Sequence, residues 1–141
     1  MTASQLRSKK PLEVTIAYAA NRHGDGVAYA AVAGDEQPLR VTFEVERRPA
    51  LQDREVGYAA LLAIAGVLAS RRARNVRMSI PDERVVLDLA ERRPLPLALA
   101  LLYVQLKCCL NTFARAEVLA GPRLDDLENR ARAEVELAAA A

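Results

Sequence analysis

The hydrophobic pattern of this chain changes its period near residue 50. Residues 39–46 (LRVTFEVE) alternate apolar and polar side chains, which predicts a strand with one buried face and one face in water. From residue 53 the apolar side chains recur every three or four positions, which predicts a helix that Asp53 caps and that runs to about residue 70. A chain that changes from strands to helices in this way is neither all-α nor all-β.

Turn residues divide the first part of the chain into three strands. Residues 14–18 and 27–32 are β-rich, and between them lies Asp25-Gly26, a dipeptide typical of hairpin turns. Gly34, Asp35 and Pro38 turn the chain again before residues 39–46. Three consecutive strands with short turns predict an antiparallel meander.

Strands and helices alternate in the rest of the chain. We expect a strand over residues 76–80, helices over 82–92 and 97–110, a strand over 116–119 and a last helix over 124–138. The order β-β-β-α-β-α-α-β-α predicts an α/β fold, in which helices pack on a five-stranded mixed sheet. Residues 1–11 are basic and end at Pro11, so we expect a flexible tail before one domain over residues 12–141.

Composition excludes several classes of protein. The chain has 20 Lys and Arg residues against 18 Asp and Glu residues, and this excess of positive charge is too small to indicate nucleic acid as a partner by itself. One His and two adjacent cysteines, Cys108 and Cys109, argue against a histidine metal site and a disulfide framework. No apolar stretch reaches the ~20 residues of a membrane span, and the polar start lacks a signal-peptide core. We therefore expect a cytoplasmic protein, and its Ala- and Arg-rich composition is typical of a high-GC bacterium.

Four segments carry a family resemblance. They read IAYAANRHGDGVAYAAV (16–32), REVGYAALLAIAGVLA (54–69), VRMSIPDERVVLDLAERRPLP (76–96) and VLAGPRLDDLENRARAEVELA (118–138). In this order and spacing they resemble the ribonuclease H family, over roughly residues 12–138. The resemblance implies the RNase H-like fold.

The resemblance also implies where the family's four catalytic carboxylates would stand, and here those positions are Ala19, Gly57, Pro81 and Arg130. In the family such carboxylates hold two Mg²⁺ ions that cleave a phosphodiester. Mg²⁺ takes oxygen ligands, which Ala, Gly and Pro side chains do not offer, and an arginine brings a positive charge instead. We therefore expect a pseudoenzyme with no catalytic residue, metal or cofactor.

Other carboxylates lie close to the substituted positions. Asp82, Asp125 and Asp126 stand where helices begin, and an N-cap or the helix dipole explains them. Glu55 is two residues from Gly57, and residues at that spacing face different sides of a helix. A nuclease with relocated carboxylates is accordingly the third hypothesis, and we expect no hydrolysis of an RNA–DNA hybrid with Mg²⁺ or Mn²⁺.

The first hypothesis is a protein that binds an RNA–DNA hybrid or another duplex through a basic groove, because a groove that reads the phosphate backbone needs cations and no carboxylates. In the family, a basic rim near the end of the first long helix helps to hold a duplex. The candidate residues are Arg22, Arg71, Arg72, Arg74, Arg123 and Arg130. We expect Arg130 to project toward Ala19, Gly57 and Pro81, with solvent or an ion pair to Asp126 as the alternatives.

The second hypothesis is a module for protein interaction or dimerisation. The helix over residues 97–110 (LALALLYVQLKCCL) carries leucines around too much of its circumference for one buried stripe. Such a helix is covered by a protein partner or by a second copy of the chain.

Overall fold

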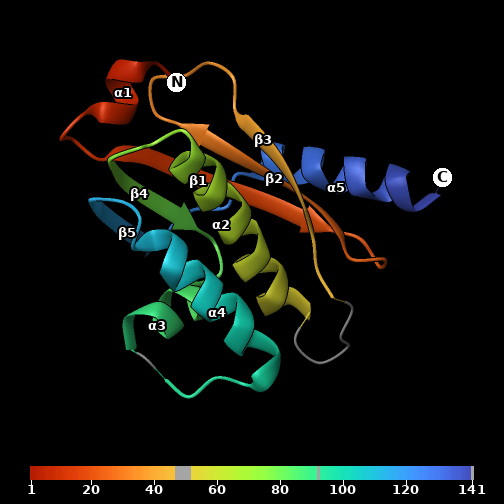
Figure 1. Cartoon of the computed structure of the whole chain (residues 1–141). Helices are drawn as coiled ribbons and strands as arrows, with labels where there is room; N and C mark the ends of the chain where they lie inside the picture. The colour runs from red at the N-terminus through yellow and green to blue at the C-terminus, as the bar shows by residue number, and fades with distance from the viewer. Residues whose placement is uncertain (47–51, 92, 141) are drawn as a thin grey trace.

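The computed structural model describes residues 1–46, 52–91 and 93–140 (Figure 1). Its elements are α1 (Ala3–Arg7), β1 (Leu12–Ala20), β2 (Asp25–Val32), β3 (Leu39–Glu44), α2 (Gln52–Ser70), β4 (Asn75–Ile80), α3 (Glu83–Glu91), α4 (Leu97–Leu110), β5 (Arg115–Ala120) and α5 (Asp125–Ala140). From β1 onward this is the order that the sequence predicts.

The five strands form one mixed sheet in the order β3-β2-β1-β4-β5. The meander β1-β2-β3 is antiparallel, whereas β4 runs parallel to β1 and β5 runs parallel to β4. The expected α/β fold with a five-stranded mixed sheet is therefore confirmed. Because β1 and β4 are parallel neighbours, their carboxyl ends lie at the same edge of the sheet.

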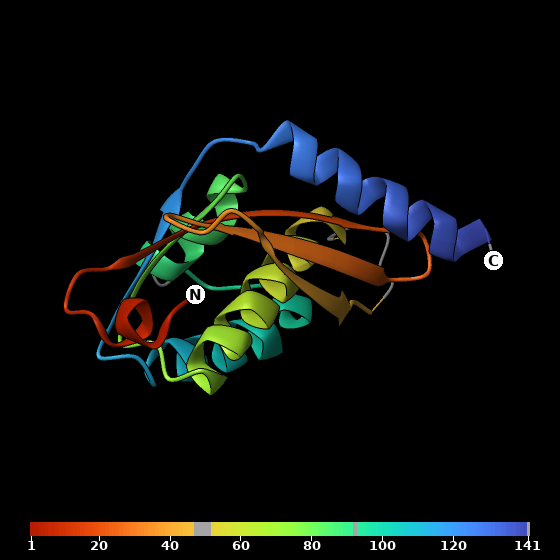
Figure 2. The ribbon, with the colours of Figure 1, turned by 90° about the horizontal axis from the view of Figure 1, so that it is seen from above.

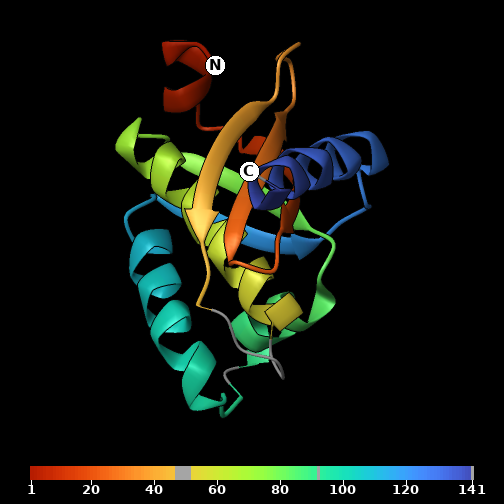
Figure 3. The same cartoon turned by 90° about the vertical axis from the view of Figure 1, so that its right-hand side faces the viewer.

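Helices cover both faces of the sheet. Figure 2 shows α5 on one face and α2 with α4 on the other. Successive side chains of β1 point to opposite faces of the sheet, so this strand contributes to both cores. Val14 and Ile16 pack with α2, whereas Ala19 packs with Ala131 of α5. Figure 3 shows that α4 lies on the outer side of this layer, beside α2.

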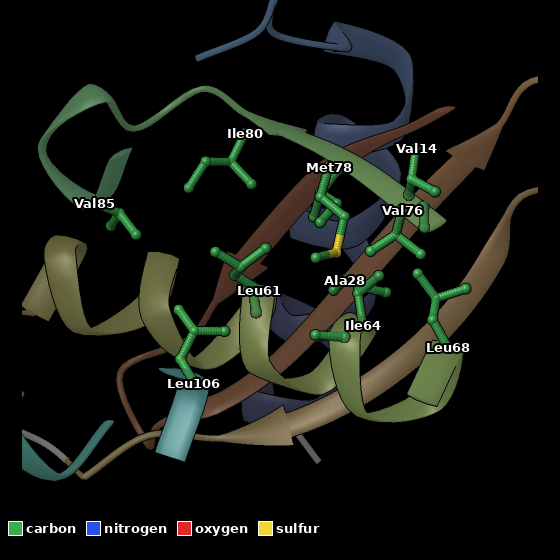
Figure 4. Packing of buried hydrophobic residues seen from close by; sticks show 14 of the residues in the cluster. Val14, Ala28, Leu61, Ile64, Leu68, Val76, Met78, Ile80, Val85 and Leu106 are labelled. Atoms are coloured by element: carbon green, nitrogen blue, oxygen red, sulfur yellow. The ribbon is translucent and has the colours of Figure 1, made fainter. Parts of the chain in front are cut away.

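The main core lies between the sheet and α2. Figure 4 shows Met78 and Ile80 of β4 facing Leu61 and Ile64 of α2, and all four side chains are fully buried. A smaller cluster on the opposite face joins Ala19, Val27, Tyr29, Ala131 and Val135. This smaller cluster fixes which side of α5 faces the sheet, and so directs the other side chains of that helix.

The first hairpin turns earlier than we expected. Asp25 and Gly26 belong to β2, and the turn is made by residues 21–24, where Gly24 has a φ of +88°. The buried Asn21 holds this turn, because its side-chain oxygen accepts hydrogen bonds from the backbone N–H groups of His23 and Asp25. A buried amide that satisfies the turn competes successfully with the local Asp-Gly preference.

Two further expectations need correction. The helix α2 begins at Gln52, so Asp53 lies within its first turn and is not its N-cap. Residues 1–11 do not form a detached tail, because α1 begins with a capping box between Thr2 and Gln5, and the backbone oxygen of Leu6 accepts a hydrogen bond from Arg74. Among the described residues, no helix combines the length and hydropathy that a membrane span requires.

Candidate functional site

A cleft of about 910 Å³ opens at the edge of the sheet where β1 and β4 end. Its walls are the end of β1, the first turns of α2 and α3, and one side of α5. Nine charged side chains line it: Arg22, Asp53, Asp82, Glu83, Arg84, Arg123, Glu128, Arg132 and Glu136. Four are basic and five are acidic, so this cleft is not a uniformly basic groove.

Tyr18 fills the base of the cleft. A Cβ atom added at Gly57 would lie 3.1 Å from the Tyr18 hydroxyl oxygen, 3.2 Å from a methyl group of Val85 and 3.6 Å from an oxygen of Asp82. Burial, with the nearby carboxylate of Asp82, raises the pKa of Tyr18 well above its ordinary value. Gly57, at the position that the resemblance assigns to a catalytic Glu, thus packs against the uncharged hydroxyl of Tyr18.

Asp82 lies two residues beyond the end of β4 and caps α3. Its carboxylate accepts the backbone N–H of Arg84 at 3.0 Å, as expected for an N-cap. The same carboxylate also accepts two hydrogen bonds from the Arg84 guanidinium, from Nε at 3.1 Å and from Nη2 at 2.8 Å. Its oxygens are therefore occupied by the protein's own donors.

Glu128 forms the second ion-paired group of the cleft, on α5. Arg123 binds it in a bidentate manner at 3.1 and 2.6 Å, and Arg132 adds a contact of 3.1 Å. The hydrogen bond from Arg123 lowers the pKa of Glu128 from its ordinary value, and Arg132 contributes in the same direction. The carboxylate stays ionised and neutralised within the cleft.

These side chains do not fit a two-metal site. Ala19 and Pro81 offer no side-chain oxygen, the space at Gly57 is filled, and Asp82 is taken by Arg84. Over the described part of the chain, no three His, Cys, Asp or Glu side chains are placed so that they could hold a metal ion. Asp125 and Asp126 are exposed in the first turn of α5 and do not line the cleft. We derive no metal-dependent step from this donor set.

Arg130 does not project into the cleft as we expected. Its guanidinium lies over the ring of Tyr29, 5.0 Å from the centroid, on the β2 side of α5. The reason is the rotation of α5, which packs Leu127, Ala131 and Val135 on the sheet. That contact places Glu128, Arg132 and Glu136 along the cleft, whereas Arg130 and Glu134 lie on the opposite flank of the helix.

The six arginines that we expected to form one groove lie in three places. Arg22 and Arg123 line the cleft, and Arg130 covers Tyr29. Arg71, Arg72 and Arg74 follow the last residue of α2, whose first turn borders the cleft. A helix of 19 residues is ~28 Å long, so the two groups are well separated.

Sequence reasoning did not nominate Tyr18, Arg84, Glu128 or Arg132 as site residues. For Glu128 and Arg132 the sequence does contain a pattern that could have been used. Residues 128, 132 and 136 recur every four positions on α5 and so share one side of that helix. For Tyr18 the signal is the alternation in β1, which places it on the same face as Ile16. Neither signal says that these two faces meet.

Comparison with known proteins supports the fold. No model of a known protein family matches the sequence, and no curated protein sequence matches it. Among solved structures, RNase H1 of the archaeon Halobacterium salinarum is 17% identical with a TM-score of 0.65, covering 88% of this chain and 93% of that one. The N-terminal RNase H domain of a Mycobacterium tuberculosis protein is 17% identical with a TM-score of 0.63, covering 92% and 96%.

A third similar structure contains nucleic acid. It is the LC11 RNase H1, isolated from compost and solved with an RNA/DNA hybrid, and it is 10% identical with a TM-score of 0.58. The alignment covers 86% of this chain and 91% of that chain. The chain described here thus has the RNase H-like fold.

Proposed function

We propose that this RNase H-like chain binds nucleic acid, such as an RNA–DNA hybrid, without cleaving it. The observation that carries the proposal is the pairing of the cleft carboxylates: Asp82 is held by Arg84, and Glu128 by Arg123 and Arg132. Arginine donors occupy oxygens that hydrolysis would need for metal ions. Neutralising these carboxylates also removes repulsion toward a phosphate backbone.

The fold and the remaining cations support binding. The hybrid-bound relative shows that a chain with this fold can hold an RNA/DNA hybrid. Arg22, Arg71, Arg72 and Arg74 are exposed and form no ion pair among the described residues, so their charges are free for phosphates. Arg123 and Arg130 are the remaining candidate contacts, although each is already engaged within the protein.

The test combines hydrolysis with binding. A labelled RNA–DNA hybrid incubated with the purified chain and Mg²⁺ or Mn²⁺ stays intact, while fluorescence anisotropy reports binding that weakens steeply as salt rises. Matched single-stranded and double-stranded DNA probes identify the preferred form. Cleavage that Asp82→Asn or Asp126→Asn abolishes would overturn the inactive assignment, and no binding at low salt would overturn the nucleic-acid assignment.

A second candidate function is self-association through α4. Leu97, Leu101 and Val104 are 90%, 66% and 55% exposed, whereas Leu99 and Leu106 are fully buried. The exposed residues are spaced by four and three positions, as in the seam of a coiled coil, so the same stripe of a second copy can pack against it. The stripe itself carries no charge that would oppose such a contact.

Sedimentation velocity separates the two functions. If α4 joins two copies, Leu101→Glu shifts the chain from dimer to monomer and leaves its circular dichroism unchanged. Gln105→Glu, an exposed position beside the stripe, is the control of equal charge and leaves the dimer intact. A wild-type chain that stays monomeric at high concentration rules out this candidate.

We also propose that the protein works in the cytoplasm of a bacterium, where thiols stay reduced. Cys108 and Cys109 are both free, and Cys108 is exposed. An exposed free thiol persists in a reducing compartment. Expression with cytoplasmic and periplasmic targeting followed by thiol labelling tests this placement, because periplasmic export would oxidise Cys108.

A further inference from the structure

Exposed cations from three distant segments meet at the end of the molecule opposite the cleft. The segments are the end of α1 with the residues after it, the turn between α2 and β4, and the first residue of β5 (Figures 1 and 3). We name this surface the basic pole; its members are Arg7, Lys9, Lys10, Arg71, Arg72, Arg74 and Arg115.

Backbone hydrogen bonds hold the three segments together. The N–H of Arg74 donates to the backbone oxygen of Leu6 at 2.8 Å, and the oxygen of Arg74 accepts the N–H groups of Ala114 and Arg115 at 3.0 and 3.3 Å. The side-chain amide of Asn75 donates to the backbone oxygen of Lys9 at 2.6 Å. The basic pole is thus a fixed surface of the fold, although its members are far apart in the sequence.

The charges of the basic pole are not neutralised within the described part of the protein. None of its members forms an ion pair there. By contrast, Arg77 of β4, three residues after Arg74, forms ion pairs with both Glu13 and Glu117. Those two carboxylates are therefore already engaged. Lys and Arg exceed Asp and Glu by only two in the whole chain, so gathering seven cations here leaves the rest of the molecule net negative.

Arg72 is held in a conformation that favours glycine. Its φ is +61°, and Arg72 is the only described residue other than glycine with a positive φ. The N–H groups of Arg72 and Ala73 bond to the oxygens of Ala69 and Leu68, both at 3.0 Å, which is the Schellman arrangement at a helix end. An arginine at this position costs stability relative to glycine, which adopts a positive φ without steric cost, and its exposed side chain adds one more cation to the basic pole.

We propose that the basic pole binds the sugar–phosphate backbone of nucleic acid, at a site distinct from the cleft. This inference rests on the proposed function and adds to the cleft a second surface that contacts phosphates. Several exposed cations without carboxylates fit a row of phosphates, and the surface presents no aromatic side chain for stacking on bases. Binding at the basic pole is therefore independent of base sequence, with each phosphate contact adding about 0.9 to the salt slope for a duplex.

The experiment compares arginine losses at the two ends of the molecule. Anisotropy of a labelled RNA–DNA hybrid across a salt series is expected to show that Arg71→Gln with Arg74→Gln lowers affinity about tenfold and reduces the slope by about two units. Arg72→Gly lowers affinity while raising the melting temperature, a combination that a merely structural role does not produce. Arg22→Gln tests the cleft end in the same assay, and Arg93→Gln, which removes an exposed arginine outside both the cleft and the basic pole, is the control for the loss of a surface charge.

The possible results of this experiment distinguish failure of the basic pole as the binding site from failure of nucleic-acid binding itself. Wild-type binding that the basic-pole variants leave unchanged, with loss of affinity in Arg22→Gln, would overturn this inference and keep the proposed function. A wild-type chain that binds no nucleic acid would overturn both. Binding to phosphatidylserine vesicles in place of the hybrid would assign the basic pole to a lipid surface and overturn the nucleic-acid inference.

Discussion

Tyr18 and Gly57 share one small volume at the base of the cleft. The phenol of Tyr18 approaches α2 so closely that a side chain at Gly57 meets both the hydroxyl and Val85. The glycine is therefore a packing requirement, since its helical backbone needs no unusual φ. The absence of a side chain at Gly57 and the ring of Tyr18 are therefore complementary in volume.

A double-mutant cycle tests this coupling. We expect Gly57→Glu to lower the free energy of unfolding by about 1–3 kcal/mol, because the new side chain overpacks against Tyr18. In a Tyr18→Ala background the same substitution costs less, since the space is free. Chemical denaturation of the four variants measures both effects, and strictly additive values would show that the two residues do not share the volume.

Glu128 gives the cleft a defined response to acid. Its pKa is lowered in the folded chain, chiefly by the hydrogen bond from Arg123, so the folded state favours the ionised form. The stability from this group is fully present above the ordinary Glu pKa of 4.5 and is lost as pH falls below that value.

Glu128→Gln tests the acid response. We expect this variant to be less stable than the wild type at neutral pH and to show a shallower loss of stability between neutral and acidic pH. Thermal melts over that range provide the measurement, with exposed Glu136→Gln on the same side of α5 as the control. Equal pH dependence in the wild type and in Glu128→Gln would contradict the assignment.

A buried ion pair joins the elements α2 and α3. Arg54 and Tyr58 are one turn apart on α2, and both donate to Asp88 of α3, at 2.9 Å from Arg54 Nε and 2.8 Å from the Tyr58 hydroxyl. Burial, together with this hydrogen bond, raises the pKa of Tyr58 well above its ordinary value. Asp88 is 1% exposed, so the contact is shielded from water.

Removal of the Asp88 carboxylate breaks this polar contact between α2 and α3. Asp88→Ala leaves a guanidinium and a hydroxyl without their partner, and we expect a loss of about 3–5 kcal/mol in the free energy of unfolding. Asp82→Ala, which breaks the more exposed ion pair with Arg84 at the start of the same helix, costs clearly less. Urea denaturation ranks the variants, and similar losses in both would show that burial does not decide the strength of the Asp88 contact.

At the scale of the whole molecule, the cleft and the basic pole lie at opposite ends of the protein. The helix α2 connects them, with Gly57 near one end and Arg72 just beyond the other. At 1.5 Å per residue these positions are ~22 Å apart, and the described contacts give them no shared partner.

This separation predicts additive stability effects. We expect Arg72→Gly to stabilise the fold by about 1 kcal/mol, because glycine adopts a positive φ without steric cost. Combined with Gly57→Glu, the two changes sum to within about 0.5 kcal/mol. Chemical denaturation of the double variant checks this sum, and a larger deviation would reveal coupling through α2.

The sequence alone determined the order of the strands and helices from residue 12 onward and the type of sheet. Residues 39–44 show why, since their alternation is a local property that does not depend on the rest of the chain. The same alternation in β1 predicts which residues face each helix layer. A helix at residues 3–7 escaped prediction because a short capping box, with few apolar residues, supports it.

Only the tertiary structure decided how the side chains meet at the two ends of the molecule. The side of α5 that borders the cleft is set by the contact of Ala131 and Val135 with β1 and β2, because charged residues surround this helix and define no strong apolar stripe. That contact brings Glu128 and Arg132 into the cleft and turns Arg130 toward Tyr29. The basic pole likewise exists only after folding, since hydrogen bonds join segments that lie 40 to 68 positions apart in the chain.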